Sequence, residues 1–180
     1  MLHYRGGASG PGGESLSQDH LAKANSSGNY GTCTAGYLCT VLDGATNWYR
    51  GTAPHYVMAP ALNAWGHVSW YATWSGSSSY TTWLTYDIDN GFPLVAGIYE
   101  RASSSTPHLV GHPTNIVISH WIAMNGYSSS GAQTYYADTV HGTSFWSWSP
   151  NVPAFSWIAS GSTGISYMIS DPNGYYGYVA

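Results

Sequence analysis

The stretch GHPTNIVISHWIAMNGYSSSGAQTYYAD, residues 111–138, predicts two neighbouring strands joined by a turn. Residues 116–124 form an apolar run of strand length around His120, rich in β-branched and aromatic side chains. Asn125-Gly126 and the serines after it supply turn residues, and residues 133–137 return as a second strand that ends at Asp138. We expect this hairpin to bring His120 and Asp138 to the same end of adjacent strands.

Such a pair of residues can do acid–base chemistry. A carboxylate that accepts a hydrogen bond from one imidazole nitrogen fixes the tautomer and leaves the other nitrogen free to act as a base. His120 and Asp138 are therefore candidate catalytic residues. The alternative is that His120 is a hydrogen-bonded core histidine and Asp138 caps a strand end.

The pattern GHP-x-N-x-x-x-x-HWI-x-x-x-GYS-x-x-G-x-x-x-YYAD in this stretch resembles the C-terminal half of the C39-like peptidase domain of secreted actinobacterial proteins. Upstream, residues 15–25 resemble the SQ-x-x-LA helix of that family, and residues 89–100 resemble the start of one of its strands. The resemblance implies an α+β, papain-like fold, with N-terminal helices followed by a mostly antiparallel sheet, in a single domain over residues 1–180. It also implies that His120 is the general base and Asp138 the orienting carboxylate of a Cys-His-Asp triad.

The nucleophile of this family is expected in a CGPA-type motif, on a helix that precedes the SQ-x-x-LA segment. Residues 1–14 resemble only the last turn of that helix followed by a Gly-rich linker. The cysteine, the Gly-Pro pair and an oxyanion-hole glutamine have no counterpart in this sequence. The resemblance thus predicts a truncated central helix and a chain that does not hydrolyse peptide bonds as written.

The two cysteines, Cys33 and Cys39, lie six positions apart. In a secreted protein a small local disulfide is the expected state of such a pair. The alternative is that Cys33, close to a predicted helix N-terminus where a thiolate is favoured, replaces the missing nucleophile.

The composition argues against some classes of binding partner and favours one cellular compartment. Only 7% of the 180 residues are charged whereas 16% are aromatic, and four Lys plus Arg with a net charge of −4 argue against nucleic acid and anionic membranes as partners. No apolar run approaches the roughly 20 residues of a membrane-spanning helix. The Ser-, Gly- and Tyr-rich composition and the resemblance favour a secreted, extracellular protein.

Histidines and tryptophans outside the hairpin carry weaker signals. His108 and His112 are four apart in a loop that contains two prolines, without a recognised zinc spacing, so we expect no metal and no cofactor. The resemblance instead places His108, His112 and Trp121 at the rim of a cleft. Three tryptophans lie near the C-terminus: Trp146, Trp148 and Trp157. They could form a platform for sugar rings or peptide side chains, or they could pack the core.

Sequence periodicity and turn residues predict the remaining elements. Helices are expected over residues 16–24, 34–43 and 80–90, with a short one beginning at residues 61–65. Strands are expected over residues 68–73 and 92–99.

Two functions stay open on these grounds. One is a cysteine peptidase domain that acts on peptides or proteins, represented here without its nucleophile. The other is a non-catalytic extracellular binding or self-assembling subunit, a homo-oligomer or filament, formed through the Tyr-rich end at Tyr175, Tyr176 and Tyr178.

Overall fold

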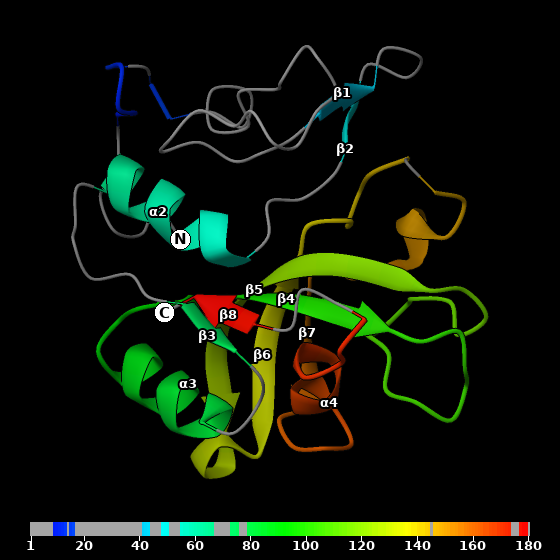
Figure 1. Cartoon of the computed structure of the whole chain (residues 1–180). Coiled ribbons are helices and arrows are strands. Elements are labelled where there is room, and N and C mark those ends of the chain that lie inside the picture. Colours follow the sequence, from blue (N-terminus) through cyan, green and yellow to red (C-terminus); the bar gives the residue numbers. More distant parts are fainter. Residues whose placement is uncertain are drawn as a thin grey trace. The chain divides into compact units, whose positions relative to one another are not determined.

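The computed structural model describes residues 9–13, 15–16, 41–43, 48–50, 55–66, 73–75, 79–144, 146–173 and 177–179 (Figure 1). The chain divides into two compact units, Met1–Thr73 with Val179 and Trp74–Tyr178 with Ala180. Cys33, Cys39 and most of the predicted helix over residues 16–24 lie outside the described residues.

The first unit contains a two-stranded antiparallel sheet and one described helix. Strands β1 (Val41–Asp43) and β2 (Trp48–Arg50) pair with Leu42 opposite Tyr49. The predicted helix over residues 34–43 is therefore wrong at its end, where pairing with β2 overrides the helical pattern. Helix α2 (His55–Gly66) begins six residues before the predicted short helix, and its buried side chains recur at helical spacing: Met58, Leu62 and Trp65.

The second unit opens with helix α3 (Tyr80–Asp89), close to the bounds predicted from the sequence. Tyr80 and Leu84 are buried one turn apart. Asn90 caps the helix, and Gly91 follows it with a φ of 81° that lets the chain reverse. Phe92 then donates its N–H to the Asp87 carbonyl. This is the hydrogen-bond pattern of a glycine-terminated helix, as the sequence predicted.

A six-stranded sheet forms the framework of this unit (Figure 1). Its spatial order is β3 (Thr73–Ser75), β8 (Gly177–Val179), β4 (Leu94–Glu100), β5 (Ile118–Ser128), β6 (Gln133–Asp138) and β7 (Phe155–Ala159). Strands β4 to β7 pair antiparallel in sequence order. The predicted α+β class with an antiparallel sheet is confirmed.

The β5–β6 hairpin is present, and its turn occupies only the last part of the predicted turn stretch. Strand β5 runs through Asn125-Gly126 with a register shift there, and a short 3-10 turn over Ser129–Gly131 reverses the chain. A Cβ on Gly126 would lie 3.1 Å from Cβ of Tyr135 on β6, so this glycine serves close strand contact rather than a turn.

Three C-terminal elements differ from the expectation or were not predicted. β7 and the one-turn-and-a-half helix α4 (Ile165–Ile169) have no strong periodicity in the sequence. β8 lies inside the sheet between β3 and β4, with Val179 fully buried. The expectation of a free Tyr-rich C-terminal edge is therefore wrong for residues 177–179.

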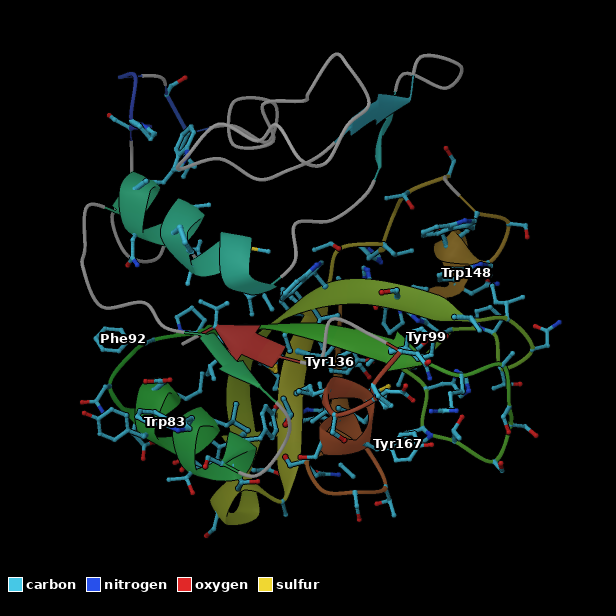
Figure 2. All side chains as sticks on the ribbon, viewed as in Figure 1. Trp83, Phe92, Tyr99, Tyr136, Trp148 and Tyr167 are labelled. Carbon is cyan, nitrogen blue, oxygen red and sulfur yellow. The ribbon has the colours of Figure 1, made fainter. Side chains whose placement is uncertain are left out.

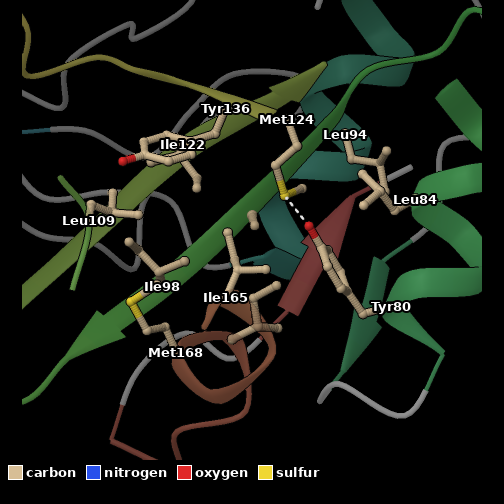
Figure 3. Packing of buried hydrophobic residues seen from close by; sticks show 12 residues of the cluster. Tyr80, Leu84, Leu94, Ile98, Leu109, Ile122, Met124, Tyr136, Ile165 and Met168 are labelled. Carbon is tan, nitrogen blue, oxygen red and sulfur yellow. Dashed lines mark hydrogen bonds between the residues drawn. The ribbon is translucent and has the colours of Figure 1, made fainter. Parts of the chain in front are cut away.

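The core of this unit lies between the sheet and helices α3 and α4 (Figure 3). Ile98 and Met124 from the sheet meet Ile165 and Met168 from α4, all fully buried. The hydroxyl group of Tyr80 on α3 lies 3.1 Å from Met124 Sδ, to which it can donate. It also lies 2.8 Å from Thr134 Oγ1, and either oxygen can be the donor in that contact. These contacts satisfy the buried phenol. This packing holds β4, β5 and β6 rigidly, and these three strands carry the candidate site.

Candidate active site

Three polar side chains gather at one end of the sheet because neighbouring strands run antiparallel. Glu100 ends β4, His120 stands near the start of β5, and Asp138 ends β6. The register sets Ile98 opposite His120 and Ile122 opposite Asp138, so these residues share one face of the pleated sheet.

His120 and Asp138 are in direct contact. His120 Nε2 lies 2.8 Å from Asp138 Oδ1, which also accepts the backbone N–H of Val140 at 2.9 Å. The side chain of His120 is 11% exposed, whereas that of Asp138 is fully buried. The contact predicted from the hairpin is present, and Nδ1 of His120 has no hydrogen-bond partner among the described residues.

The donors around Asp138 keep it ionised. Burial by itself would raise the pKa of this carboxyl, but hydrogen bonds from His112 and His120 outweigh burial and hold the pKa well below its usual range. The carboxylate can therefore only accept hydrogen bonds, which leaves His120 as the donor through Nε2.

A tight turn brings His112 to the other oxygen of Asp138. His112 N–H donates to the Leu109 carbonyl at 3.1 Å, and Gly111 between them has φ of 84°. A Cβ at Gly111 would lie 2.7 Å from the Asn151 carbonyl oxygen, so both the backbone angle and the space require glycine.

His112 bridges two buried carboxylates. Its Nδ1 lies 2.8 Å from Glu100 Oε2, and its Nε2 lies 3.1 Å from Asp138 Oδ2. Burial alone would lower the pKa of the imidazole, but hydrogen bonds to Asp138 and Glu100 outweigh burial and raise the pKa to about 9. The two carboxyl groups therefore favour the protonated form of His112.

The segment that carries His112 is fixed by two further backbone contacts. Leu109 N–H donates to Glu100 Oε1 at 2.7 Å, and Val110 N–H donates to Tyr136 Oη at 3.0 Å. Figure 2 labels Tyr136 on β6, and its side chain is fully buried. The loop between β4 and β5 is thereby anchored to both strands that flank the site.

Tryptophans from the segment after β6 cover His112. The Trp148 ring, labelled in Figure 2, meets the His112 ring edge-on with centroids 4.8 Å apart. Trp146 stacks on Trp148 with centroids 5.0 Å apart. These two tryptophans thus pack beside the site, while Trp157 lies on β7.

The expected rim residues are not at a rim. His112 is fully buried by its side chain, the His108 side chain is 7% exposed, and Trp121 is buried. His108 Nε2 lies 3.0 Å from the Ser103 carbonyl, and its Nδ1 lies 3.7 Å from Glu100 Oε2. The rim expectation came from the family resemblance, whereas in the structure the side chains of both histidines lie in the interior beside Glu100.

The same side chains were tested as metal ligands. Among the described residues, ligand atoms of His112, His120 and Asp138 lie within 4.8 Å of one another. Two ligands of a tetrahedral zinc ion at about 2.0 Å would be roughly 3.3 Å apart. The observed contacts of 2.8 and 3.1 Å are shorter than that, and they are a hydrogen bond from His120 and an ion-pair contact with His112.

Sequence reasoning missed Glu100 altogether. The chain has only eight acidic residues, and Glu100 ends an apolar strand where a charge is costly to bury. An isolated carboxylate at the end of a buried strand was the signal that it has a buried partner.

The site thus consists of an imidazole hydrogen-bonded to a buried carboxylate at one end of an antiparallel sheet, in an α+β fold. The model of the Peptidase_C39 like family matches residues 1–165. The chain belongs to this family. Neither a curated protein nor a solved structure matched the chain.

No helix in the described part of the chain has the length and apolar character needed to cross a membrane.

Proposed function

We propose that this chain carries the base half of a cysteine peptidase site, with His120 as the general base and Asp138 as its orienting carboxylate. The observation that carries the proposal is the 2.8 Å contact between His120 Nε2 and Asp138 Oδ1, in a chain matched by the family over residues 1–165. Peptide or protein chains are the substrate class that the family suggests.

The chemistry follows from which nitrogen is occupied. Because Nε2 of His120 donates to an ionised carboxylate, Nδ1 carries the free lone pair. A thiol within reach of Nδ1 would lose its proton to the imidazole and attack the peptide carbonyl, and the resulting imidazolium would donate that proton to the leaving amine as the C–N bond breaks. The carboxylate stabilises that imidazolium and keeps its ring in place.

The thiol is the component that this sequence does not supply in the family motif. Cys33 and Cys39 follow the segment that resembles the SQ-x-x-LA helix, whereas the expected nucleophile precedes it. We therefore infer that the chain as written does not cleave peptide bonds. From its composition and its family resemblance we also infer that it acts in a secreted, extracellular setting.

Peptide digestion tests this proposal on the chain as written. Unstructured peptide mixtures are incubated with the protein and with His120→Ala, Cys33→Ala and Cys39→Ala variants, and new termini are counted by mass spectrometry. We expect no cleavage that depends on His120. Cleavage abolished by both His120→Ala and Cys33→Ala would show that Cys33 is the nucleophile and overturn the missing-thiol part of the proposal.

A second candidate function is non-catalytic self-assembly, and an observation on β7 favours it. β7 is the last strand in the order of the sheet, and its side chains Phe155 and Trp157 are 51% and 45% exposed. Both rings contact Tyr135 of β6, with centroids 5.7 and 4.8 Å away. An aromatic edge strand of this kind favours pairing with a second copy of the same edge.

Light scattering tests that candidate. Self-assembly through β7 predicts particles larger than a monomer at micromolar concentration, and a shift toward monomer when Trp157→Lys places a charge on the edge. Thr163→Lys, on the segment before α4, is the control that should leave the distribution unchanged. A monodisperse monomer for the unmodified chain would exclude this function under those conditions.

A further inference from the structure

His112 is a fully buried residue whose two ring nitrogens each face a carboxylate oxygen, at 2.8 Å to Glu100 and 3.1 Å to Asp138. A neutral imidazole has one N–H and one lone pair, so it can donate to only one of the two. Unless a carboxyl group is protonated, the second contact would set a lone pair against a lone pair. The geometry therefore calls for a proton on both nitrogens.

The charges around the ring are consistent with that state. Glu100 on β4 and Asp138 on β6 provide two negative charges, and both side chains are fully buried. The other titratable groups that face this cluster are His120 on β5, with ring centroids 5.7 Å from His112, and His108, with Nδ1 3.7 Å from Glu100. Tyr136 contributes its hydroxyl from β6 to the same loop.

The contact with Asp138 matters for the candidate base. One oxygen of this carboxylate accepts from His120 and from the Val140 N–H, and the other faces His112. Oδ1 is held by two hydrogen bonds and Oδ2 by an ion-pair contact, and together these restrict rotation of the carboxylate away from His120. Glu100 holds His112 in turn, and its second oxygen accepts the Leu109 N–H.

We propose that His112, held by Glu100, is a positioning residue that carries a proton on each ring nitrogen and fixes the carboxylate of Asp138 in the orientation that His120 requires. The proposal rests on the proposed role of His120 as base, and it adds a four-residue chain that runs Glu100, His112, Asp138, His120. The pKa of His112, raised to about 9 by the two carboxylates, supports the doubly protonated state.

The positive charge on His112 also opposes the field that Asp138 exerts on His120. Removing that charge should make His120 easier to protonate. For unit charges about 6 Å apart, at effective dielectric constants between those of a protein surface and water, the pKa of His120 should rise by roughly 0.5 to 2 units. A residue that only filled space would not shift the pKa of His120 in this direction.

Nuclear magnetic resonance of the 15N-labelled chain tests the proposal without any need for catalysis. The imidazole 15N shifts report the protonation of each nitrogen across a pH series, in the unmodified protein and in His112→Phe and Glu100→Gln. We expect His112 to be doubly protonated at pH 7 in the unmodified protein, the pKa of His120 to rise in His112→Phe, and the pKa of His112 to fall in Glu100→Gln. His108→Gln, which removes a neighbouring histidine without touching Asp138, is the control and should leave His120 unchanged.

Glu100→Gln keeps the size of the side chain and serves where His112→Phe does not fold. A neutral His112 at pH 7 in the unmodified protein overturns the proposal. So does an unchanged pKa of His112 in a folded Glu100→Gln variant. These outcomes are independent of peptide cleavage, so failure of the proposed function would remain distinguishable from failure of this inference.

Discussion

Nε2 of His120 lies 2.8 Å from Oδ1 of Asp138, across the two strands of the β5–β6 hairpin. Because the register sets Ile122 opposite Asp138, His120 reaches the carboxylate diagonally from two residues earlier on β5. Oδ1 of this buried carboxylate accepts from His120 and from the Val140 N–H, and Oδ2 lies 3.1 Å from His112 Nε2, so removal of the carboxylate should affect stability as well as chemistry.

Asp138→Asn should destabilise the protein by about 2 to 4 kcal/mol, because it leaves the His112 imidazolium facing a neutral amide inside the protein. Chemical denaturation measures this change in the free energy of unfolding. Asp89→Asn is the matched control, since exposed Asp89 accepts one hydrogen bond from Tyr127 and should change stability by less than about 1 kcal/mol. Equal losses in the two variants would contradict a special role for Asp138.

Stability should fall as the pH rises above neutral. The pKa of His112 is raised in the folded protein to about 9 from an ordinary value of 6.5, so its contribution is complete below 6.5 and is lost as the pH rises through about 9. The shift corresponds to about 3 kcal/mol at most. Asp138 has the opposite dependence, because its pKa is lowered and its contribution is lost in acid.

Denaturation at a series of pH values measures this profile. The unmodified protein should be most stable between roughly pH 4 and 6.5. His112→Phe should be less stable overall and should lose most of the alkaline decline. An unchanged alkaline decline in that variant would show that another group is responsible.

Glycine should be required at position 111 but not at position 142, although both residues have the same type of backbone conformation. Gly111 and Gly142 both have positive φ, 84° and 70°, so alanine at either costs about 1 to 2 kcal/mol in backbone strain. Only at Gly111 would the new Cβ meet a backbone oxygen, Asn151 O at 2.7 Å, whereas Gly142 has open space.

Gly111→Ala should therefore destabilise the protein by clearly more than Gly142→Ala, and it should also displace His112 and weaken the alkaline dependence of stability. Thermal melting of both variants at pH 6 and pH 9 compares these effects. Similar melting temperatures for the two variants at both pH values would argue against the tight turn at Gly111.

The sequence predicted the elements whose signals are local. Helix α3 follows from its buried spacing and the glycine after it, and the antiparallel β5–β6 hairpin follows from two apolar runs that end near His120 and Asp138. The turn was predicted to begin too early, because Asn125-Gly126 has the composition of a turn but sits where two strands approach closely. Local composition does not distinguish these two uses of glycine.

The part of the site that could not be predicted depends on contacts between distant residues. Glu100 and His112 are twelve positions apart, and the loop between them returns only because Leu109 and Val110 donate to Glu100 and Tyr136. Prolines beside His108 and His112 indicated a loop at the surface. The buried carboxylate at the end of β4 overrides that tendency by binding an imidazole in the interior.

Zinc should not stabilise the protein. The ligand atoms of His112, His120 and Asp138 are already paired by hydrogen bonds, and a metal would have to displace protons from both imidazoles. Thermal melting at pH 7 with a tenfold excess of Zn²⁺, and again with a chelator, should give the same midpoint. A zinc-dependent rise that disappears in Asp138→Asn would instead assign a metal site to these residues.

The most direct test of the central claim is alkylation by a peptidyl chloromethyl ketone, which modifies a histidine base positioned beside a bound peptide. Peptide mapping of the alkylated chain compares His120 with exposed His141, whose Nδ1 lies 2.7 Å from the Val152 carbonyl and which serves as an internal reference. Our account predicts that His120 is alkylated before His141 in the unmodified chain. In Asp138→Asn, alkylation of His120 should be at least tenfold slower than in the unmodified chain. Alkylation of His120 no faster than His141, or unaffected by Asp138→Asn, would contradict the assignment of His120 and Asp138 as the base half of a peptidase site.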